Sequence, residues 1–494
     1  MRAKRTRPDG GADKRRLRSS RKLDAVVVGA GPNGLAAAVT LAQAGRSVLV
    51  LEAQDTIGGG TRTAELTLPG FRHDVCSAIH PLVAASPFFS SLGLELDLVE
   101  PPAALAHPLD GGSAVLLRRS VDDTARALGG DGEAYRRLFA PLVGDWPRLA
   151  RELLGPVVHV PRHPVALARF GRSGIRSARS LAETRFATEE ARGLFGGASA
   201  HSLIPLERRA SAAFGLMLLV LAHVTGWPFA RGGSQAIADA LAARLRALGG
   251  EIETGREVTS LRELPPTKVV LCDVTPRQLI ALADDRLPQG YRRRLDAWRY
   301  GPGIFKLDYA LDSPIPWRTP EVAQAATVDL GGTLAEIAES ERAPWQGRHA
   351  DRPFVLLAQQ SLFDDTRAPA GKHTAWAYCH VPHGSTVDVR ERVEQQIERF
   401  APGFRERVLA CSARTTPELE RENANLVGGD IGGGANLLGQ VIARPSPRRL
   451  PYATPLPWLY ICSASTPPGG GVHGMCGYHA ARAVLRRGDP PSEG

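Results

Sequence analysis

Short runs of apolar residues alternate with a helical pattern at the start of the chain. Residues 23–29 (LDAVVVG) are apolar and β-branched, which is typical of a parallel strand buried on both faces. Small and apolar residues recur at helical spacing over residues 35–44, Gly45 ends that helix, and residues 47–51 form a second apolar run. This order predicts a β-α-β unit with a glycine-rich turn between its first strand and its helix.

The remaining chain shows further helix and strand patterns. Residues 100–226 are helical and rich in arginine, and the apolar stretch at 214–224 predicts a helix buried on most sides. A strong helical pattern follows Ser234, the expected N-cap, and residues 251–258 return to a strand. Alternation at 303–311 and 376–382 predicts half-exposed strands. Two shorter apolar runs predict buried strands at 269–272 and 459–462.

The turn of the β-α-β unit, residues 29–34 (GAGPNG), has the spacing of a dinucleotide-binding motif. Gly29 allows a tight turn, Gly31 lets the backbone approach a pyrophosphate, and Gly34 permits close contact between helix and strand, while the helix N-terminus attracts an anion. Glu52 ends the second strand, where it is expected to bind ribose hydroxyls and to repel a 2'-phosphate. The predicted cofactor contacts in this unit are Gly29, Gly31, Pro32, Asn33, Gly34 and Glu52.

A second glycine turn directly follows Glu52. Residues 55–63 (DTIGGGTRT) place Gly58 and Gly59 before Arg62. A second close approach of backbone, with an arginine to offset pyrophosphate charge, suits a long extended dinucleotide. These residues therefore favour FAD over NAD as the cofactor.

Glycines also gather near the other end of the chain. The buried strand at 459–462 leads into residues 464–474, and small residues at 475–485 favour a helix. The N-terminus of that helix would present N–H groups and positive dipole to the flavin pyrimidine edge, where negative charge grows on reduction. The contacts predicted here are Gly470, Gly471, Val472 and His473. The glycines of residues 428–434 indicate either another close approach of backbone or a flexible loop.

These motifs resemble the FAD-binding fingerprint of flavin amine oxidases and bacterial phytoene desaturases. Through residues 69–74 (PGFRHD) and 80–82 (HPL), the chain is similar to the phytoene desaturase-like group that contains pyridine nucleotide-disulfide oxidoreductase domain-containing protein 2. The resemblance covers nearly all of residues 23–486. It implies an FAD-dependent oxidoreductase in which Val258 meets the adenine through its backbone. It also suggests that Lys306 reaches the flavin N5 through a water, with a solvated strand lysine as the alternative.

The expected chemistry is hydride transfer from a largely apolar organic substrate to the flavin N5. With one dinucleotide fingerprint in the chain, oxygen or a quinone is the expected electron acceptor. Four histidines are candidate bases without known geometry: His73, His80, His380 and His473. A flavin amine oxidase, or a flavin-binding regulatory protein with little turnover, remains the alternative.

Charge is distributed very unevenly along the chain. The formal net charge is +10, and residues 1–22 carry +8 of it with ten Lys or Arg against two Asp, which leaves +2 for the rest. A nearly neutral body excludes a nucleic-acid-binding domain. The basic segment is expected to be a disordered arm, a contact for an anionic membrane or polyanion, or a targeting peptide.

Cysteine spacing and hydropathy indicate the state of the thiols and the expected cellular location. The six cysteines show no C-x-x-C and no metal-ligand spacing, so buried free thiols are expected and no metal site. The longest apolar stretch, residues 214–224, is well short of the roughly 20 residues that cross a bilayer. A cytoplasmic protein, possibly in peripheral contact with a membrane, is the expectation.

The predicted fold class is α/β, with a Rossmann-like FAD-binding domain built on a parallel sheet and an interleaved α+β substrate domain with an antiparallel sheet. The predicted FAD-binding domain comprises residues 23–100, 227–300 and 425–488. The predicted substrate domain comprises residues 101–226 and 301–424.

Overall fold

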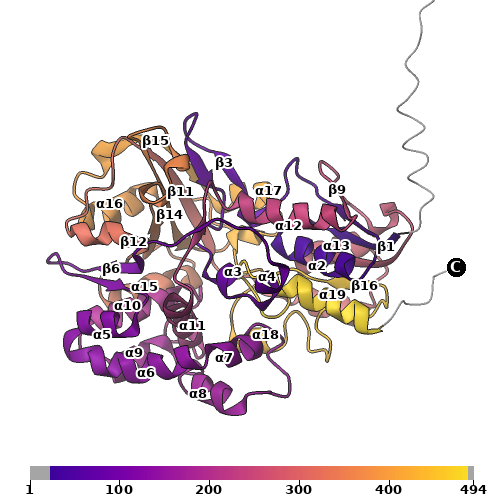
Figure 1. The fold of residues 1–494 in the computed structure, drawn as a ribbon, viewed down its shortest axis with the longest axis horizontal. Coiled ribbons are helices and arrows are strands. Elements are labelled where there is room, and N and C mark those ends of the chain that lie inside the picture. Colours follow the sequence, from indigo (N-terminus) through magenta and orange to yellow (C-terminus); the bar gives the residue numbers. More distant parts are fainter. Residues whose placement is uncertain (1–22, 488–494) are drawn as a thin grey trace, which may run out of the picture.

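Five parallel strands form the first sheet of the computed structural model, which describes residues 23–487 (Figure 1). Their order is β16-β10-β1-β2-β9. The predicted β-α-β unit is confirmed, because β1 and β2 are parallel neighbours joined by helix α2 (Pro32–Gln43). The predicted basic arm lies outside the described residues. The strands are β1 (Leu23–Val28), β2 (Val48–Leu51), β9 (Glu251–Glu253), β10 (Thr267–Cys272) and β16 (Leu459–Ile461).

Helices cover both faces of this sheet, as apolar strands without alternation require. Ala25 and Val27 of β1 belong to the core on one face, and Val26 and Val28 belong to the core on the other. Ligands of such sheets bind beyond the carboxyl ends of the strands. The first face is covered by α2, α12 (Gln235–Ala247) and α19 (Met475–Arg487), and the second by α13 (Pro276–Ala283) and α14 (Gln289–Asp296).

The strand predicted at residues 251–258 is shorter than expected. β9 ends at Glu253, because Gly255 takes a φ of +63° and the amide of Arg256 donates to the Glu52 carbonyl oxygen at 2.8 Å. The chain therefore turns across the end of β2. Val258 lies beyond this turn, half-buried against the core of the second face.

Ser234 occupies the predicted N-cap position of α12, but its side chain does not cap the helix. Ser234 directly precedes the helix, but its hydroxyl donates to the Ser77 carbonyl oxygen at 2.8 Å and contacts His80 Nε2 at 2.9 Å. Its amide donates to Asp74 Oδ1, and the buried Arg367 binds the other oxygen of that carboxylate at 3.0 Å. This network fixes the segment after β4 (Arg72–Asp74), whose next residues line the candidate site.

Seven strands form the second sheet, in the order β15-β11-β14-β13-β12-β6-β7. Neighbours are antiparallel except β12 and β6, so the predicted antiparallel sheet is confirmed with one parallel pair. The predicted half-exposure is wrong, because all nine residues of β11 are buried between core clusters on its two faces. The strands are β6 (Ala103–Pro108), β7 (Ala114–Leu117), β11 (Gly303–Leu311), β12 (Ala325–Leu330), β13 (Val355–Ala358), β14 (His373–Val381) and β15 (Val408–Arg414).

Helices also surround the second sheet. α11 is buried along most of its length, as predicted for the apolar stretch at 214–224. α15 (Leu334–Arg342) packs against α10, α16 (Arg390–Phe400) packs against β12, and α17 (Thr416–Glu422) follows β15. The helical layer at the bottom of Figure 1 consists of α5 (Val121–Ala127), α6 (Gly132–Gly144), α7 (Trp146–Leu153), α8 (Pro164–Gly174), α9 (Ala178–Arg185), α10 (Glu189–Ala200) and α11 (Ser211–Val224).

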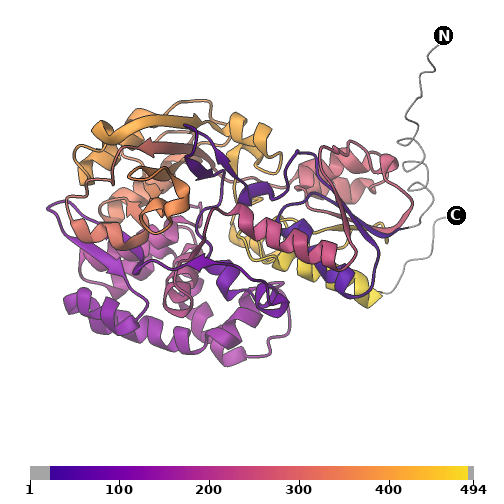
Figure 2. The same ribbon diagram turned by 45° about the horizontal axis from the view of Figure 1, so that its top comes forward.

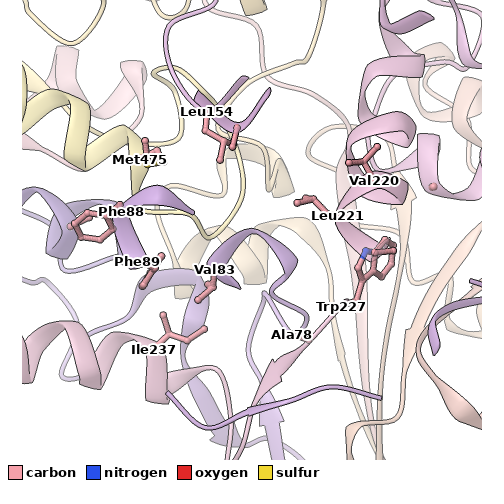
Figure 3. Close-up of a cluster of buried hydrophobic side chains, with 14 of the residues drawn as sticks. Ala78, Val83, Phe88, Phe89, Leu154, Val220, Leu221, Trp227, Ile237 and Met475 are labelled. Atoms are coloured by element: carbon pink, nitrogen blue, oxygen red, sulfur yellow. The ribbon is translucent and has the colours of Figure 1, made fainter. Parts of the chain in front are cut away.

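The two sheets lie in two lobes that share a hydrophobic core (Figure 2). Figure 3 shows part of that core around Val83. Ile237 of α12 and Met475 of α19 lie on one side of it, and Val220 of α11 lies on the other side. Short helices α3 (Pro81–Ala85) and α4 (Pro87–Leu92) supply residues between the lobes. The lobes are therefore packed together through one continuous core.

Candidate functional site

A cavity of about 330 Å³ lies where the carboxyl ends of the parallel strands meet one face of the seven-stranded sheet. Both glycine turns of the N-terminal unit and the glycine loop before α19 reach it, so segments far apart in sequence share one site. The predicted residues that line it are Gly31, Pro32, Asn33, Gly59, Gly471 and Val472.

The first glycine turn leaves no room for side chains. Gly29 has a φ of +99°, and a Cβ on Gly34 would come within 2.0 Å of the Gly29 carbonyl oxygen. Gly31 ends the turn as the N-cap of α2, and it has no side chain that could accept hydrogen bonds from the first N–H groups of the helix. The first turn of α2 also contains no acidic residue. The helix end thus presents N–H groups and positive dipole to the cavity, and binding of an anion there stays a prediction.

Glu52 supports this turn from β2. Its Oε2 accepts the amide of Ala30 at 2.7 Å, and its Oε1 accepts that of Gln54 at 3.0 Å. The side chain is buried, and its carboxylate oxygens have lone pairs beyond these two bonds. Ribose recognition by Glu52 stays a prediction.

The second glycine turn closes over the first. The amide of Gly58 donates to the Ala30 carbonyl oxygen at 2.9 Å, and a Cβ on Gly59 would lie 3.2 Å from the Gly31 Cα. Arg62 points its guanidinium at backbone, with donations to the carbonyl oxygens of Gly59 at 3.1 Å and Glu422 at 2.6 Å. Arg62 therefore braces this turn, and its action on a pyrophosphate stays a prediction.

Asp273 is the acid that sequence reasoning missed. It directly follows β10, lines the cavity, and its Oδ2 accepts the amide of Gly34 at 2.8 Å across 239 residues of sequence. Burial and the nearby charge of Glu52 raise the pKa of Asp273 to about 7. Its position at the carboxyl end of a parallel strand was the available signal.

The loop before α19 forms the opposite wall. Gly471 has a φ of +123°, Val472 lines the cavity, and Gly470 packs against Gly432. A Cβ on Gly477 would come within 1.8 Å of the Asn33 carbonyl oxygen, so the first turns of α19 and α2 touch backbone to backbone. Two helix N-termini thus lie beside one cavity.

His473 has a structural position in this loop. Its Nδ1 accepts the amide of Met475 at 3.0 Å, and its Nε2 lies 3.2 Å from the Gly469 carbonyl oxygen. These partners favour the neutral tautomer protonated at Nε2. Burial lowers the pKa of His473 to about 4. The side chain caps α19 and is not among the residues that line the cavity.

The far end of the cavity is largely apolar and aromatic. Two buried polar atoms of the residues that line this end have no hydrogen-bond partner, His201 Nε2 and Trp376 Nε1. Burial lowers the pKa of His201 to about 3, so this ring is neutral near pH 7. The principal residues at this end are Ile304, Leu356, Trp376 and Tyr378 from the sheet, with His201, Leu218 and Trp227 from the helical layer.

Lys306 lies inside the protein, which excludes the alternative of a solvated strand lysine. It is fully buried, forms an ion pair with Asp308, and its Nζ lies 5.7 Å from the centroid of the Trp376 ring. Arg414 binds the same carboxylate. Burial lowers the pKa of Lys306 to about 8 although Asp308 acts in the opposite direction. Register places Lys306 opposite Tyr378, beside the cavity wall.

The remaining candidate histidines are also buried. His73 faces Asp308 at 3.7 Å and His80 contacts Ser234, and burial lowers the pKa of both histidines to about 4. His380 Nδ1 lies 2.8 Å from the Glu341 carboxylate, and its Nε2 has no partner. None of these three is among the cavity-lining residues.

The residues present fit an FAD. Both glycine turns border the cavity at the N-terminus of α2, and the buried Asn33 Oδ1 has no hydrogen-bond partner. The glycine loop before α19 offers a second helix end. Within residues 23–487, no group of His, Cys, Asp and Glu has the arrangement of a metal site, and no helix is long and apolar enough to cross a membrane.

The model of the family described as flavin containing amine oxidoreductase matches residues 33–285, about half of the chain. This chain belongs to that family. The matched part contains α2 from Asn33 onward, the second glycine turn and Asp273, whereas Gly29 and Gly31 of the first turn precede it. The predicted membership in the flavin amine oxidase superfamily is confirmed, and the protein is a flavin-type oxidoreductase by family.

Relatives in this family extend over most of the chain. Pyridine nucleotide-disulfide oxidoreductase domain-containing protein 2 of Mus musculus is 26% identical over 94% of each chain. The phytoene dehydrogenase of Streptomyces griseus is 28% identical over 82% of this chain and 80% of its own. The cyclohexylamine oxidase of Brevibacterium oxydans has a similar fold, with a TM-score of 0.59 at 16% identity over 94% of this chain and 99% of its own. The predicted fold class is confirmed.

Proposed function

We propose that the protein binds one FAD and oxidises a neutral, largely apolar organic molecule by removing a hydride. The observation that carries the proposal is the shared cavity, in which glycine turns at two helix ends meet an aromatic sheet face. The phytoene dehydrogenase similarity supports a desaturase-type reaction. We also propose the division into a discontinuous FAD-binding domain and a substrate domain at the boundaries predicted from sequence.

The chain's own groups would hold the cofactor at three places. The α2 N-terminus, with Gly31 and Gly59, would take the pyrophosphate, and Glu52 and Val258 the adenosine end. The loop at Val472 would take the flavin ring. A bound flavin supplies an acceptor for two electrons and a proton.

Apolar walls would orient the substrate and exclude water. Trp376, Tyr378 and Leu356 come from adjacent strands and form a rigid surface. Among the described residues that line the cavity, Asp273 is the one acid, and it sits at the glycine-turn end. Asp308 lies opposite Trp376 in the sheet, but it pairs with Lys306 and Arg414 and does not line the cavity. An ammonium substrate would therefore find no carboxylate in the aromatic end of the lining, which favours a neutral molecule over an amine.

Lys306 is the proposed proton-holding group beside the cavity. With a pKa near 8, its Nζ is protonated below that pH and neutral above it. Lys306→Met is expected to slow flavin reduction by about tenfold or more while flavin content is unchanged. The pH profile of the reduction rate should lose its inflection near pH 8.

A matched control lies at the adjoining ends of β11 and β14. Lys372 also pairs with an aspartate, Asp312, but at an exposed position. Lys372→Met should leave the rate and its pH profile unchanged. Stopped-flow absorbance under anaerobic conditions measures both variants, and a Lys306→Met protein with the wild-type rate and profile would exclude the proposed role.

Anaerobic reduction also tests the proposed function. The purified flavoprotein is mixed without oxygen with neutral polyenes and terpenes on one side and primary amines on the other. The flavin band should bleach with members of the first group. Bleaching by amines alone would indicate an amine oxidase, and no bleaching by either group would favour a flavin-binding regulator. Reoxidation by oxygen or by a quinone then identifies the proposed acceptor.

A further inference from the structure

The loop between α7 and α8, together with the first turn of α8, presents apolar side chains to solvent. Val157, Val158, Val160 and Val165 are 45%, 72%, 90% and 72% exposed. They are four of nine large apolar side chains exposed within residues 23–487, and they fall within nine consecutive residues. Scattered exposed valines are ordinary, whereas a cluster of this kind marks an interaction site.

Polar contacts on the inner side hold this loop in shape. Oε1 of the buried Glu152 accepts the amides of Arg162 at 3.0 Å and His163 at 2.9 Å, while Oε2 contacts His159. The Nδ1 of His159 lies 2.7 Å from the Pro156 carbonyl oxygen. The loop thus wraps around a buried carboxylate of α7 and turns its valines outward, the reverse of an ordinary surface loop.

The surroundings of the valines are strongly basic. Residues 146–176 contain six arginines and one acid, the buried Glu152 at the end of α7. Two of these arginines, Arg148 and Arg169, pair with Asp145 just before this range. Arg162 and Arg172 are exposed, the latter on α8 at the edge of the molecule (Figure 1). The valine surface, defined as Val157, Val158, Val160, Val165, Arg162 and Arg172, therefore combines apolar tips with positive charge.

We propose that the valine surface binds an anionic lipid membrane. Apolar tips that enter the acyl boundary, with arginines among the headgroups, form the chemistry of a peripheral membrane contact. A second copy of the chain fits this surface less well, because the same arginines would face one another. The inference uses neither the proposed function nor residues 1–22.

Sedimentation of the full-length protein with vesicles tests the proposal. Vesicles of phosphatidylcholine with phosphatidylglycerol should bind the protein, and vesicles of phosphatidylcholine alone should bind it far more weakly. Val158→Asp with Val160→Asp should weaken binding to the anionic vesicles by about tenfold or more. Val387 is an exposed valine outside this cluster, and Val387→Asp should bind like the wild type.

Charge is tested separately. Arg162→Gln with Arg172→Gln should weaken binding by about fivefold for each arginine and reduce its dependence on salt. Flavin content and the midpoint of thermal unfolding show that each variant remains folded.

Three results would overturn the proposal. The Val158 and Val160 double variant could bind anionic vesicles as well as the wild type does. Neutralising Lys14, Arg15, Arg16 and Arg18 could abolish binding while that double variant keeps it, which would assign binding to the N-terminal segment. The lipid-free protein could be a dimer that the double variant converts to a monomer, which would make this surface an interface between copies.

Discussion

Gly477→Ala should destabilise the protein by about 3 kcal/mol or more and abolish flavin retention. The added methyl group would lie 1.8 Å from the Asn33 carbonyl oxygen and 2.8 Å from the Ala37 amide nitrogen. Both atoms are backbone in α2, so no rotamer change relieves the contact. The two helix ends would move apart, and with them the two halves of the proposed FAD site.

The matched control is another glycine inside a helix. A Cβ on Gly171 in α8 would meet nothing within 4 Å. Gly171→Ala should therefore stabilise the protein by up to about 1 kcal/mol through helix propensity. Urea unfolding and the flavin absorbance that remains after gel filtration measure both variants. A Gly477→Ala protein with normal stability and bound flavin would show that the helix contact is dispensable.

FAD affinity of the wild type should fall as pH rises through 7, by up to about tenfold per pH unit. The pKa of Asp273 is raised to about 7, so its carboxyl is neutral in acid and becomes negative above that pH. The amide that donates to Asp273 Oδ2 is that of Gly34, in the first turn of α2, where the pyrophosphate is proposed to bind. A carboxylate there repels a pyrophosphate, whereas the neutral acid does not.

Asp273→Asn should make FAD affinity nearly independent of pH between about 6 and 9, because an asparagine oxygen can accept the same amide without charge. The folded pKa of Asp273 exceeds its unfolded value of 3.8. Its contribution to stability is therefore complete below about pH 4, is lost as pH rises to 7, and should be absent in the variant. Asp285→Asn, at an exposed acid, is the control. Equal pH dependence in the wild type and Asp273→Asn would refute this role.

The glycine turns were predictable because their requirements are local. Gly29, Gly31 and Gly34 lie within six residues, and the strand and helix around them are visible in the same stretch. The same holds for the loop before α19. Each turn can be read without knowing where the rest of the chain lies.

Asp273 was not predictable in this way, because its role depends on a contact 239 residues distant. The burial of Lys306 was missed for a related reason. Lys306 and Asp308 alternate with Phe305, Leu307 and Tyr309 as in a half-exposed strand. Arg414 from β15 nevertheless pairs with Asp308 inside the protein. The local pattern predicted that Lys306 and Asp308 contact solvent, whereas in the fold they form ion pairs inside the protein.

Amide hydrogen exchange with and without ligand tests the central claim most directly. FAD should protect the amides of residues 31–35 and of residues 471–476 together, because both segments border one cavity. ADP, which has the adenosine and pyrophosphate parts alone, should protect the first segment and leave the second unchanged. Equal protection patterns for FAD and ADP, or no protection of either segment by FAD, would contradict a single flavin site between the two helix ends.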